Sequence, residues 1–247
     1  MRVWTMTRAT AVLLAVGCLS PSAGLASVGK IALVEQATRT PENGKSAPLE
    51  VGSEISLKDT LRVQKGSLKL ALSDNSVIML SQGSELVITE ADFQGQERKG
   101  FSARLVIGNI WSHVTKMIAG GSAKFEVATE RAVAGVRGTI FRVDAAKLIS
   151  AATTRHRTVV SVLEGQVGVN AKIAKPVASA AKAPPAGGGK RVQVAGPAEI
   201  SQKEWEDKFV ALQANQQVTI DEDLWKEAAY SPPAQEDAFA KFIKANQ

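Results

Sequence analysis

Side chains that commonly carry out chemistry are scarce in this sequence. It contains two histidines, His113 and His156, and a single cysteine, Cys18. His113 has apolar neighbours and His156 lies between two arginines, so neither has the grouped partners that a zinc site needs. The sequence has no Gly-rich phosphate loop or nucleophile elbow, and no carboxylate pair is singled out by its spacing. These residues predict a protein that is not an enzyme and that uses no metal or cofactor.

One short segment places a cation beside turn-forming glycines. Gly135 and Gly138 flank Val136 and Arg137, a spacing that predicts a tight turn or bulge where two strands approach closely. The turn itself does not require Arg137. Its guanidinium could bond carbonyls or a carboxylate and so lock the turn, or it could anchor a partner. The candidate motif or partner-binding residues are Gly135, Val136, Arg137, Gly138, Thr139 and Phe141.

Alternating apolar residues predict many short strands between Lys30 and Val194. Leu68, Leu70 and Leu72 show the period of two that places one side of a strand on a core. Many of the apolar stretches follow a glycine and a small polar residue, which is turn chemistry. These pairs are Gly52-Ser53, Gly66-Ser67, Gly83-Ser84, Gly108-Asn109, Gly121-Ser122, Gly138-Thr139 and Gly165-Gln166. The pattern predicts an all-β domain, either a twisted sandwich or a β-solenoid-like stack of short strands.

The N-terminus has the layout of an export signal. A basic region leads into the apolar residues 9–19, and small residues precede a candidate cleavage site after Ala26. The apolar run is too short to span a bilayer, which needs about 20 residues. Residues 1–26 are therefore predicted to be a signal peptide, and the protein to reach the periplasm or cell envelope. A second interpretation stays open, because the residues before Cys18 are similar to a lipobox and would make Cys18 a lipid anchor.

The rest of the chain is predicted to form a β domain over 27–200 and a helical extension over 201–247. The domain's core spans 50–170, and the Ala-, Pro-, Gly- and Lys-rich residues 172–190 are expected to be a flexible insertion before a strand at 191–195. A capping-box pattern predicts a helix over 202–213, and an amphipathic stretch predicts another over 235–245. These helices are expected to cap an open end or edge of the sheet.

The net charge of the chain favours contact with anionic glycans or lipid head groups over binding to nucleic acid. Its formal net charge is +6, and removal of the two signal-peptide arginines would lower it to about +4. A mild positive excess favours attraction to anionic glycans or lipid head groups. The excess is too weak and too scattered to predict nucleic-acid binding. Trp111 is the candidate for stacking on a sugar, although its apolar neighbour predicts a core position.

Residues Phe125–Val143, which read FEVATERAVAGVRGTIFRV, resemble the signature of the FecR family. In that signature a strand F-x-V-x-T leads into A-V-x-G-V-R-G-T-x-F-x-V. Residues 51–76 are similar to the family's opening strands, and Val162–Val167 resembles its closing V-x-E-G-x-V strand. The resemblance covers roughly 50–170 and extends to 190–196. It implies a FecR-like stack of short strands.

The resemblance implies a periplasmic sensor that contacts an outer-membrane transducer and signals to a sigma factor. Here the predicted signal leads directly into the β domain, and no internal stretch resembles a membrane helix. We therefore expect a stand-alone, non-catalytic binding or signalling module that contacts another cell-envelope protein. One alternative is an envelope structural protein or a protein that binds peptidoglycan or polysaccharide. Another is an assembly factor that accepts a partner strand at a sheet edge.

Overall fold

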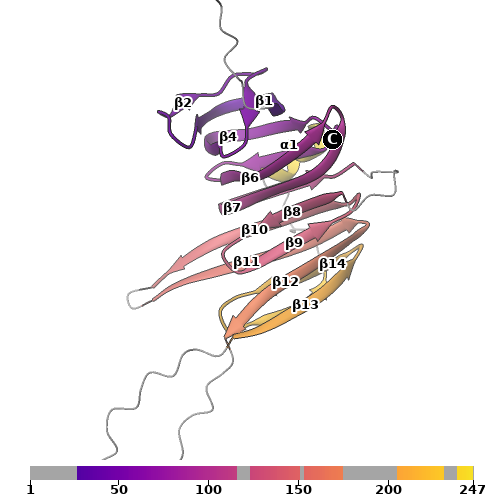
Figure 1. Cartoon of the computed structure of the whole chain (residues 1–247). Helices are drawn as coiled ribbons and strands as arrows, with labels where there is room; N and C mark the ends of the chain where they lie inside the picture. Colours follow the sequence, from indigo (N-terminus) through magenta and orange to yellow (C-terminus); the bar gives the residue numbers. More distant parts are fainter. Residues whose placement is uncertain (1–26, 116–122, 151–152, 175–204, 231–237, 247) are drawn as a thin grey trace, which may run out of the picture.

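The computed structural model describes residues 27–115, 123–150, 153–174, 205–230 and 238–246. Within these ranges the protein forms fifteen strands, which pair into one continuous sheet, and one helix (Figure 1). The strands are β1 (Ser27–Thr40), β2 (Ala47–Pro48), β3 (Glu54–Ser56), β4 (Thr60–Leu72), β5 (Val77–Ser81), β6 (Glu85–Gln94), β7 (Glu97–His113), β8 (Lys124–Ala128), β9 (Ala132–Val136), β10 (Ile140–Ile149), β11 (Thr154–Glu164), β12 (Gln166–Ala174), β13 (Trp205–Gln213), β14 (Gln216–Ile220) and β15 (Trp225–Ala229), and the helix is α1 (Ala238–Asn246). The all-β class predicted from the sequence is confirmed.

Several predicted segments lie outside the described residues. They are the signal peptide 1–26 with its lipobox alternative at Cys18, the turn at Gly121-Ser122, the strand at 191–195 and the insertion from 175 onward. Residues 172–174, predicted as the start of the insertion, instead end β12. No helix in the described ranges is long and apolar enough to cross a membrane.

The sheet folds over on itself and makes two facing layers. The first layer contains the second half of β1, the first half of β4, then β6, the first half of β7, β8, β9, β12 and β13. The second layer contains the first half of β1, the second half of β4, then β5, the second half of β7, β10, β11, β14 and β15. The pairing of β7 with β8 is parallel, and all the others are antiparallel. The result is a twisted sandwich whose longest strands belong to both layers.

Strands β4 and β7 pass between the layers at glycines with positive φ, whereas β1 passes between them at irregularities in its pairing with β4. β7 bends at Gly108, whose φ is 99°. The hydroxyl of Ser84 donates to the Asn109 carbonyl at 3.1 Å and accepts from the Asn109 amide at 3.0 Å, so neighbouring corners are bonded together. Positive φ also occurs at the predicted turn glycines Gly52, Gly66, Gly83, Gly138 and Gly165. Gly52, Gly83, Gly138 and Gly165 therefore lie in turns between strands, as predicted. Gly66 and Gly108, also predicted as turns, instead lie within β4 and β7, where they bend a continuous strand.

Inward side chains of the two layers meet in one hydrophobic core. The rings of Phe101 and Phe125 in the first layer lie 4.9 Å apart, and Phe125 meets Phe141 of the second layer edge-on at 6.3 Å. Edge-to-face contact at this distance is a favoured arrangement of aromatic rings. The alternating leucines of β4 are all buried, as their spacing predicted.

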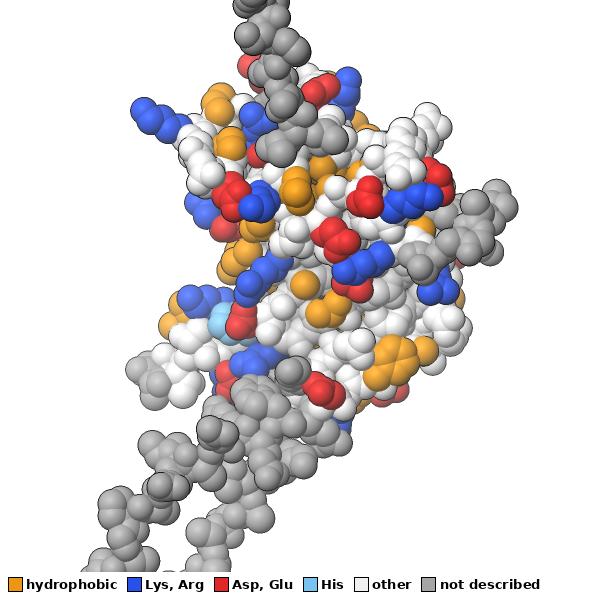
Figure 2. Space-filling view, in the orientation of Figure 1, with side chains coloured by type: hydrophobic (Ala, Val, Ile, Leu, Met, Phe, Trp, Pro, Cys, Tyr) orange, Lys and Arg blue, Asp and Glu red, His pale blue; other side chains and the backbone are white. Residues whose placement is uncertain are grey.

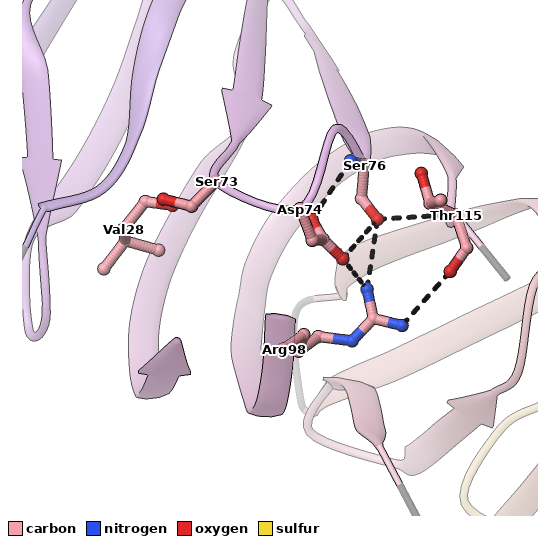
Figure 3. A network of polar contacts seen from close by, with 6 residues as sticks. All are labelled: Val28, Ser73, Asp74, Ser76, Arg98 and Thr115. Atoms are coloured by element: carbon pink, nitrogen blue, oxygen red, sulfur yellow. Dashed lines mark hydrogen bonds and ion pairs between the residues drawn. The ribbon is translucent and has the colours of Figure 1, made fainter. Parts of the chain in front are cut away.

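A buried ion pair also ties the layers together (Figure 3). Arg98 near the start of β7 points across the sandwich toward Asp74 in the turn between β4 and β5, and both side chains are almost fully buried. The Arg98 guanidinium donates to the Asp74 carboxylate, to the Ser76 hydroxyl at 3.0 Å and to the Thr115 carbonyl at 3.4 Å. It also lies 5.1 Å from the ring centroid of Phe125. Burial lowers the pKa of Arg98, and the charge of Asp74 opposes that shift.

Helix α1 covers the outer face of the second layer. Phe239 and Ile243 pack on Met79 of β5 and Trp111 of β7, and Trp111 is 2% exposed. The amphipathic helix predicted over 235–245 is confirmed, and so is the core position of Trp111. The helix covers a sheet face rather than an end or an edge, because its apolar side has the outward Met79 and Trp111 to pack against.

The helix predicted over 202–213 is wrong, because Trp205–Gln213 is the strand β13. The spacing of Phe209 and Leu212 resembled one side of a helix. In a strand, residues three apart point to opposite faces, and here Leu212 is 1% exposed while Phe209 is 66% exposed. The tertiary pairing of β13 with β12 decides the local conformation. In the described part of 201–247, the expected helical extension is thus three strands and one short helix.

Candidate functional site

The candidate motif residues divide between a corner of the stack and the strand before it. Gly138 forms the corner between β9 and β10 with a φ of 67°. Thr139 is 2% exposed and donates its hydroxyl proton to the Gln166 carbonyl at 3.0 Å. Phe141 is fully buried. Gly135, predicted as part of the turn, lies within β9 and does not have a positive φ. Gly138, Thr139 and Phe141 are therefore architectural.

Arg137 differs from its neighbours because its side chain is exposed, whereas Val136 is 4% exposed. Among the described residues, no hydrogen bond or ion pair involves the Arg137 guanidinium. The structure thus shows none of the bonds by which Arg137 was expected to lock the turn. Its five donors are available to a partner.

Gly135 belongs to a row of three small residues and one glutamate that crosses the outer face of the first layer. Strand register aligns Glu126 of β8, Gly135 of β9, Gly168 of β12 and Ala211 of β13. The row lines a shallow hollow of about 610 Å³ that also includes Arg137. We call this hollow the glycine trench. It runs across the strands, so an extended ligand lying in it would contact four of them.

An exposed aromatic ring flanks the glycine trench. Phe209 of β13 is 66% exposed, and a Cβ placed on Gly168 would lie 3.2 Å from its ring, so the ring leans over Gly168. Figure 2 shows this face with a hydrophobic patch over β13, below a band of acidic and basic side chains. The sequence prediction missed Phe209 because the residue was assigned to a helix. Exposed aromatic rings next to cations are frequent in binding sites.

The opposite rim of the glycine trench is a network of paired charges. Lys124 lies 2.8 Å from Glu90 and 3.3 Å from Glu126. The hydrogen bond from Lys124 lowers the pKa of Glu90, and a second bond from Ser102 adds to this effect. The bonds to Glu90 and Glu126 raise the pKa of Lys124. Lys124 is thus paired at this rim, whereas Arg137 forms no ion pair with any described residue.

We expect the substitution Lys124→Met to raise the pKa of Glu90, because the largest cause of its depression is removed. The depressed pKa stabilises the folded state above the ordinary pKa of a glutamate, and this contribution is lost as the pH falls through the folded value. The loss in stability should be small, because both side chains are exposed. NMR titration of the Glu90 carboxyl carbon measures the shift. An unchanged pKa in the variant would contradict the assignment of Lys124 as its cause.

The described residues hold no group of three or more His, Cys, Asp or Glu side chains arranged like metal ligands. His113 is exposed, as expected, and His156 lies in β11 rather than in a loop. The glycine trench presents a cation, an aromatic face and small residues that let a ligand approach the backbone. These features suit the binding of a partner molecule.

The two-layered stack with glycine corners is an all-β domain. A comparison with models of known protein families identifies the family of its central part. Residues 59–168 match the family model described as FecR protein. This part of the chain is a FecR domain, as the resemblance of Phe125–Val143 indicated. The match includes the Arg98–Asp74 pair and the floor of the glycine trench up to Gly168, whereas Phe209 lies outside it.

Two solved structures show a partial likeness to this chain. Both are crystal structures of a "putative anti-sigma factor" from Parabacteroides distasonis, each 17% identical to this chain. One gives a TM-score of 0.44 and covers 72% of this chain, and the other gives 0.43 and covers 74%. The chain spans only 61% and 62% of the length of these proteins. No curated protein matches the sequence.

Proposed function

We propose that this protein is an exported, non-catalytic binding and signalling module that contacts another cell-envelope protein through the glycine trench. The FecR domain supports the signalling class. The export signal predicted in residues 1–26 supports a place in the periplasm or cell envelope. The observation that carries the proposal is the floor of the trench, where Gly135 occupies a strand position that does not need a glycine.

Gly135 illustrates this point. Its φ is not positive, and a Cβ placed on it would have no neighbour closer than 3.9 Å. Glycine inside a strand weakens the strand, because it costs backbone entropy and has no side chain to pack. A glycine that neither the backbone nor the packing requires points to a backbone that something else approaches closely. Arg137 and Phe209 flank this floor and give a partner a charge and an apolar surface to recognise.

We expect Gly135→Val to abolish partner binding and to leave the free energy of unfolding unchanged or slightly higher. Valine suits a strand, and its Cβ would meet no protein atom closer than 3.9 Å while its methyl groups extend into the glycine trench. The measurement is in-cell photo-crosslinking with probes at positions 137 and 209, followed by identification of the captured molecule. A probe at Val51, which is 67% exposed and lies near the start of the stack, serves as the control position.

The proposal expects one protein to be captured from positions 137 and 209 but not from 51. It expects capture from position 209 to disappear in both Gly135→Val and Arg137→Glu, and capture from position 137 to disappear in Gly135→Val, with the melting temperature of Gly135→Val not lowered. Equal capture from all three positions, or capture that survives both substitutions, would contradict a role for the trench.

A second candidate function is binding of an envelope glycan, either peptidoglycan or another anionic polysaccharide. The observation in its favour is that the exposed Phe209 ring and the Gln166 amide line the same hollow, since sugars bind to aromatic faces and amides. Retention of the protein on cell-wall sacculi, lost in Phe209→Ala and accompanied by no protein crosslink, would establish this function in place of the first.

A further inference from the structure

A two-stranded arm projects from the second layer, and the outer backbone edges of its two strands are unpaired within the described chain. The pairing of β10 with β7 ends at Ala145, and the pairing of β11 with β14 ends at Thr158. Beyond these positions residues 146–149 and 154–157 pair only with each other. We call these residues the β10–β11 arm, and Figure 1 shows it extending well past the rest of the stack. Ser150 closes its end by donating its amide proton to the Thr153 carbonyl at 2.9 Å.

The end of the β10–β11 arm carries exposed aliphatic side chains. Ile149 is 75% exposed and Leu148 is 39% exposed. An isolated two-stranded ribbon is at best marginally stable in water, and these side chains contribute no packing to it. Their exposure therefore lacks an explanation in the fold of the described chain. Large exposed apolar side chains grouped at a projecting tip mark an interaction site.

Cations lie directly behind this apolar tip. The arm contains Lys147, Arg155 and Arg157, and the sequence has no acidic residue between 145 and 163. Arg155, which lies opposite Leu148 in the register, is 3.5 Å from Asp223, and Arg157 is 3.3 Å from Asp221, so both arginines form ion pairs with the turn between β14 and β15. Lys147 is exposed and lies opposite His156 in the strand register. Among the described residues, Lys147 is thus the cation of the arm that forms no ion pair.

We infer that the β10–β11 arm inserts its tip into the surface of an anionic membrane. Ile149 is two residues beyond Lys147, which is about 7 Å at the rise of an extended strand. Membrane-surface segments bury their apolar side roughly 5–10 Å deep, at the boundary of head groups and acyl chains. Insertion of Ile149 to that depth places Lys147 at the level of the lipid phosphates. Charge complementarity therefore favours anionic head groups.

This membrane contact is separate from the proposed partner site. The glycine trench lies on the outer face of the first layer and ends beside Arg137, whereas the arm extends the second layer beyond Ala145. Because the pairing of β10 runs from Ile140 opposite His113 to Ala145 opposite Gly108, the arm leaves the stack at the end of β10 away from Arg137. One surface could be occupied while the other is free.

The test is flotation with lipid vesicles of the chain from Ser27, where the described fold begins. One set of vesicles contains phosphatidylcholine alone and the other also contains phosphatidylglycerol. We expect the protein to float with the anionic vesicles, and Ile149→Glu to lower the partition coefficient by about tenfold or more, as expected for loss of a buried isoleucine. Lys147→Glu should reduce binding to the anionic vesicles alone. Val51→Glu is the matched control and should bind like the unaltered protein.

Three results would overturn the inference. The unaltered chain could fail to float with either set of vesicles. Ile149→Glu could float as well as Val51→Glu does. The unaltered chain could also form a dimer in sedimentation experiments that Ile149→Glu dissociates, which would identify the arm as an interface between two copies. A trench variant such as Gly135→Val should float normally, so failure of this inference is distinguishable from failure of the proposed function.

Discussion

Replacement of Arg98 by leucine is expected to lower the free energy of unfolding by about 3–5 kcal/mol, the range for breaking a buried ion pair on one side. The variant leaves the Asp74 carboxylate buried without its counter-charge, although the Ser76 amide and hydroxyl still donate to it. It also removes the guanidinium from the ring of Phe125. The two layers then lose the bond that joins them beside the turn between β4 and β5. Chemical denaturation measures the effect.

Two further variants isolate the cause of this loss. Arg62→Leu breaks the exposed pair with Glu85 and should cost no more than about 1 kcal/mol. The double variant Arg98→Leu, Asp74→Asn removes both charges and should recover part of the lost stability, because the desolvated carboxylate is gone. If Arg98→Leu is no more destabilising than Arg62→Leu, the buried pair does not hold the layers together.

The substitution Gly108→Ala is expected to destabilise the protein by about 4 kcal/mol, from the sum of backbone strain and overpacking. A φ of 99° is strained for any residue with a Cβ. In addition, a Cβ on Gly108 would overlap both the backbone and the side chain of Ser84. Because Ser84 bonds Asn109 at the next corner, it cannot move without breaking those bonds. Thermal denaturation gives the difference in melting temperature.

Gly83→Ala is the matched control for this prediction. Gly83 has a φ of 78°, yet a Cβ on it would meet nothing within 4 Å. Its substitution therefore carries the backbone strain alone, about 1 kcal/mol or somewhat more. Equal losses in Gly83→Ala and Gly108→Ala would show that backbone strain, and not the close approach of the corners, sets the need for glycine.

Local patterns in the sequence predict much of this fold. The alternation of Leu68 to Leu72 identifies a strand because a strand on a core must alternate. The glycine and polar pairs identify turns because few other residues accept positive φ. These signals are short-range, so they place strands and turns but do not define which strands become neighbours. The choice between a sandwich and a solenoid depended on that long-range pairing.

The candidate site was only partly predictable for the same reason. Arg137 stands out in the sequence because the turn beside it does not need a cation. The glycine trench requires Gly135, Gly168 and Phe209 to meet across three strands, which no local spacing indicates. Arg98 occurs in a charged stretch typical of a solvated turn, and its partner Asp74 is 24 residues away. A three-residue spacing placed Phe209 in a helix, whereas pairing with β12 makes it part of a strand.

The central position of β7 in the sheet determines how local unfolding of the protein can proceed. In the described pairing, β1 to β6 bond among themselves and to β7, and β8 to β15 bond among themselves and to β7. All backbone ladders between the two halves therefore run through this one strand. Local unfolding of either half can proceed without breaking the other's ladders as long as β7 stays in place. Amide protons of β7 that donate to β5 or β6 are therefore expected to exchange when the first half opens, and those that donate to β8 or β10 when the second half opens. The strand loses all its ladders only when both halves open, so hydrogen exchange along β7 reports the opening of each half separately.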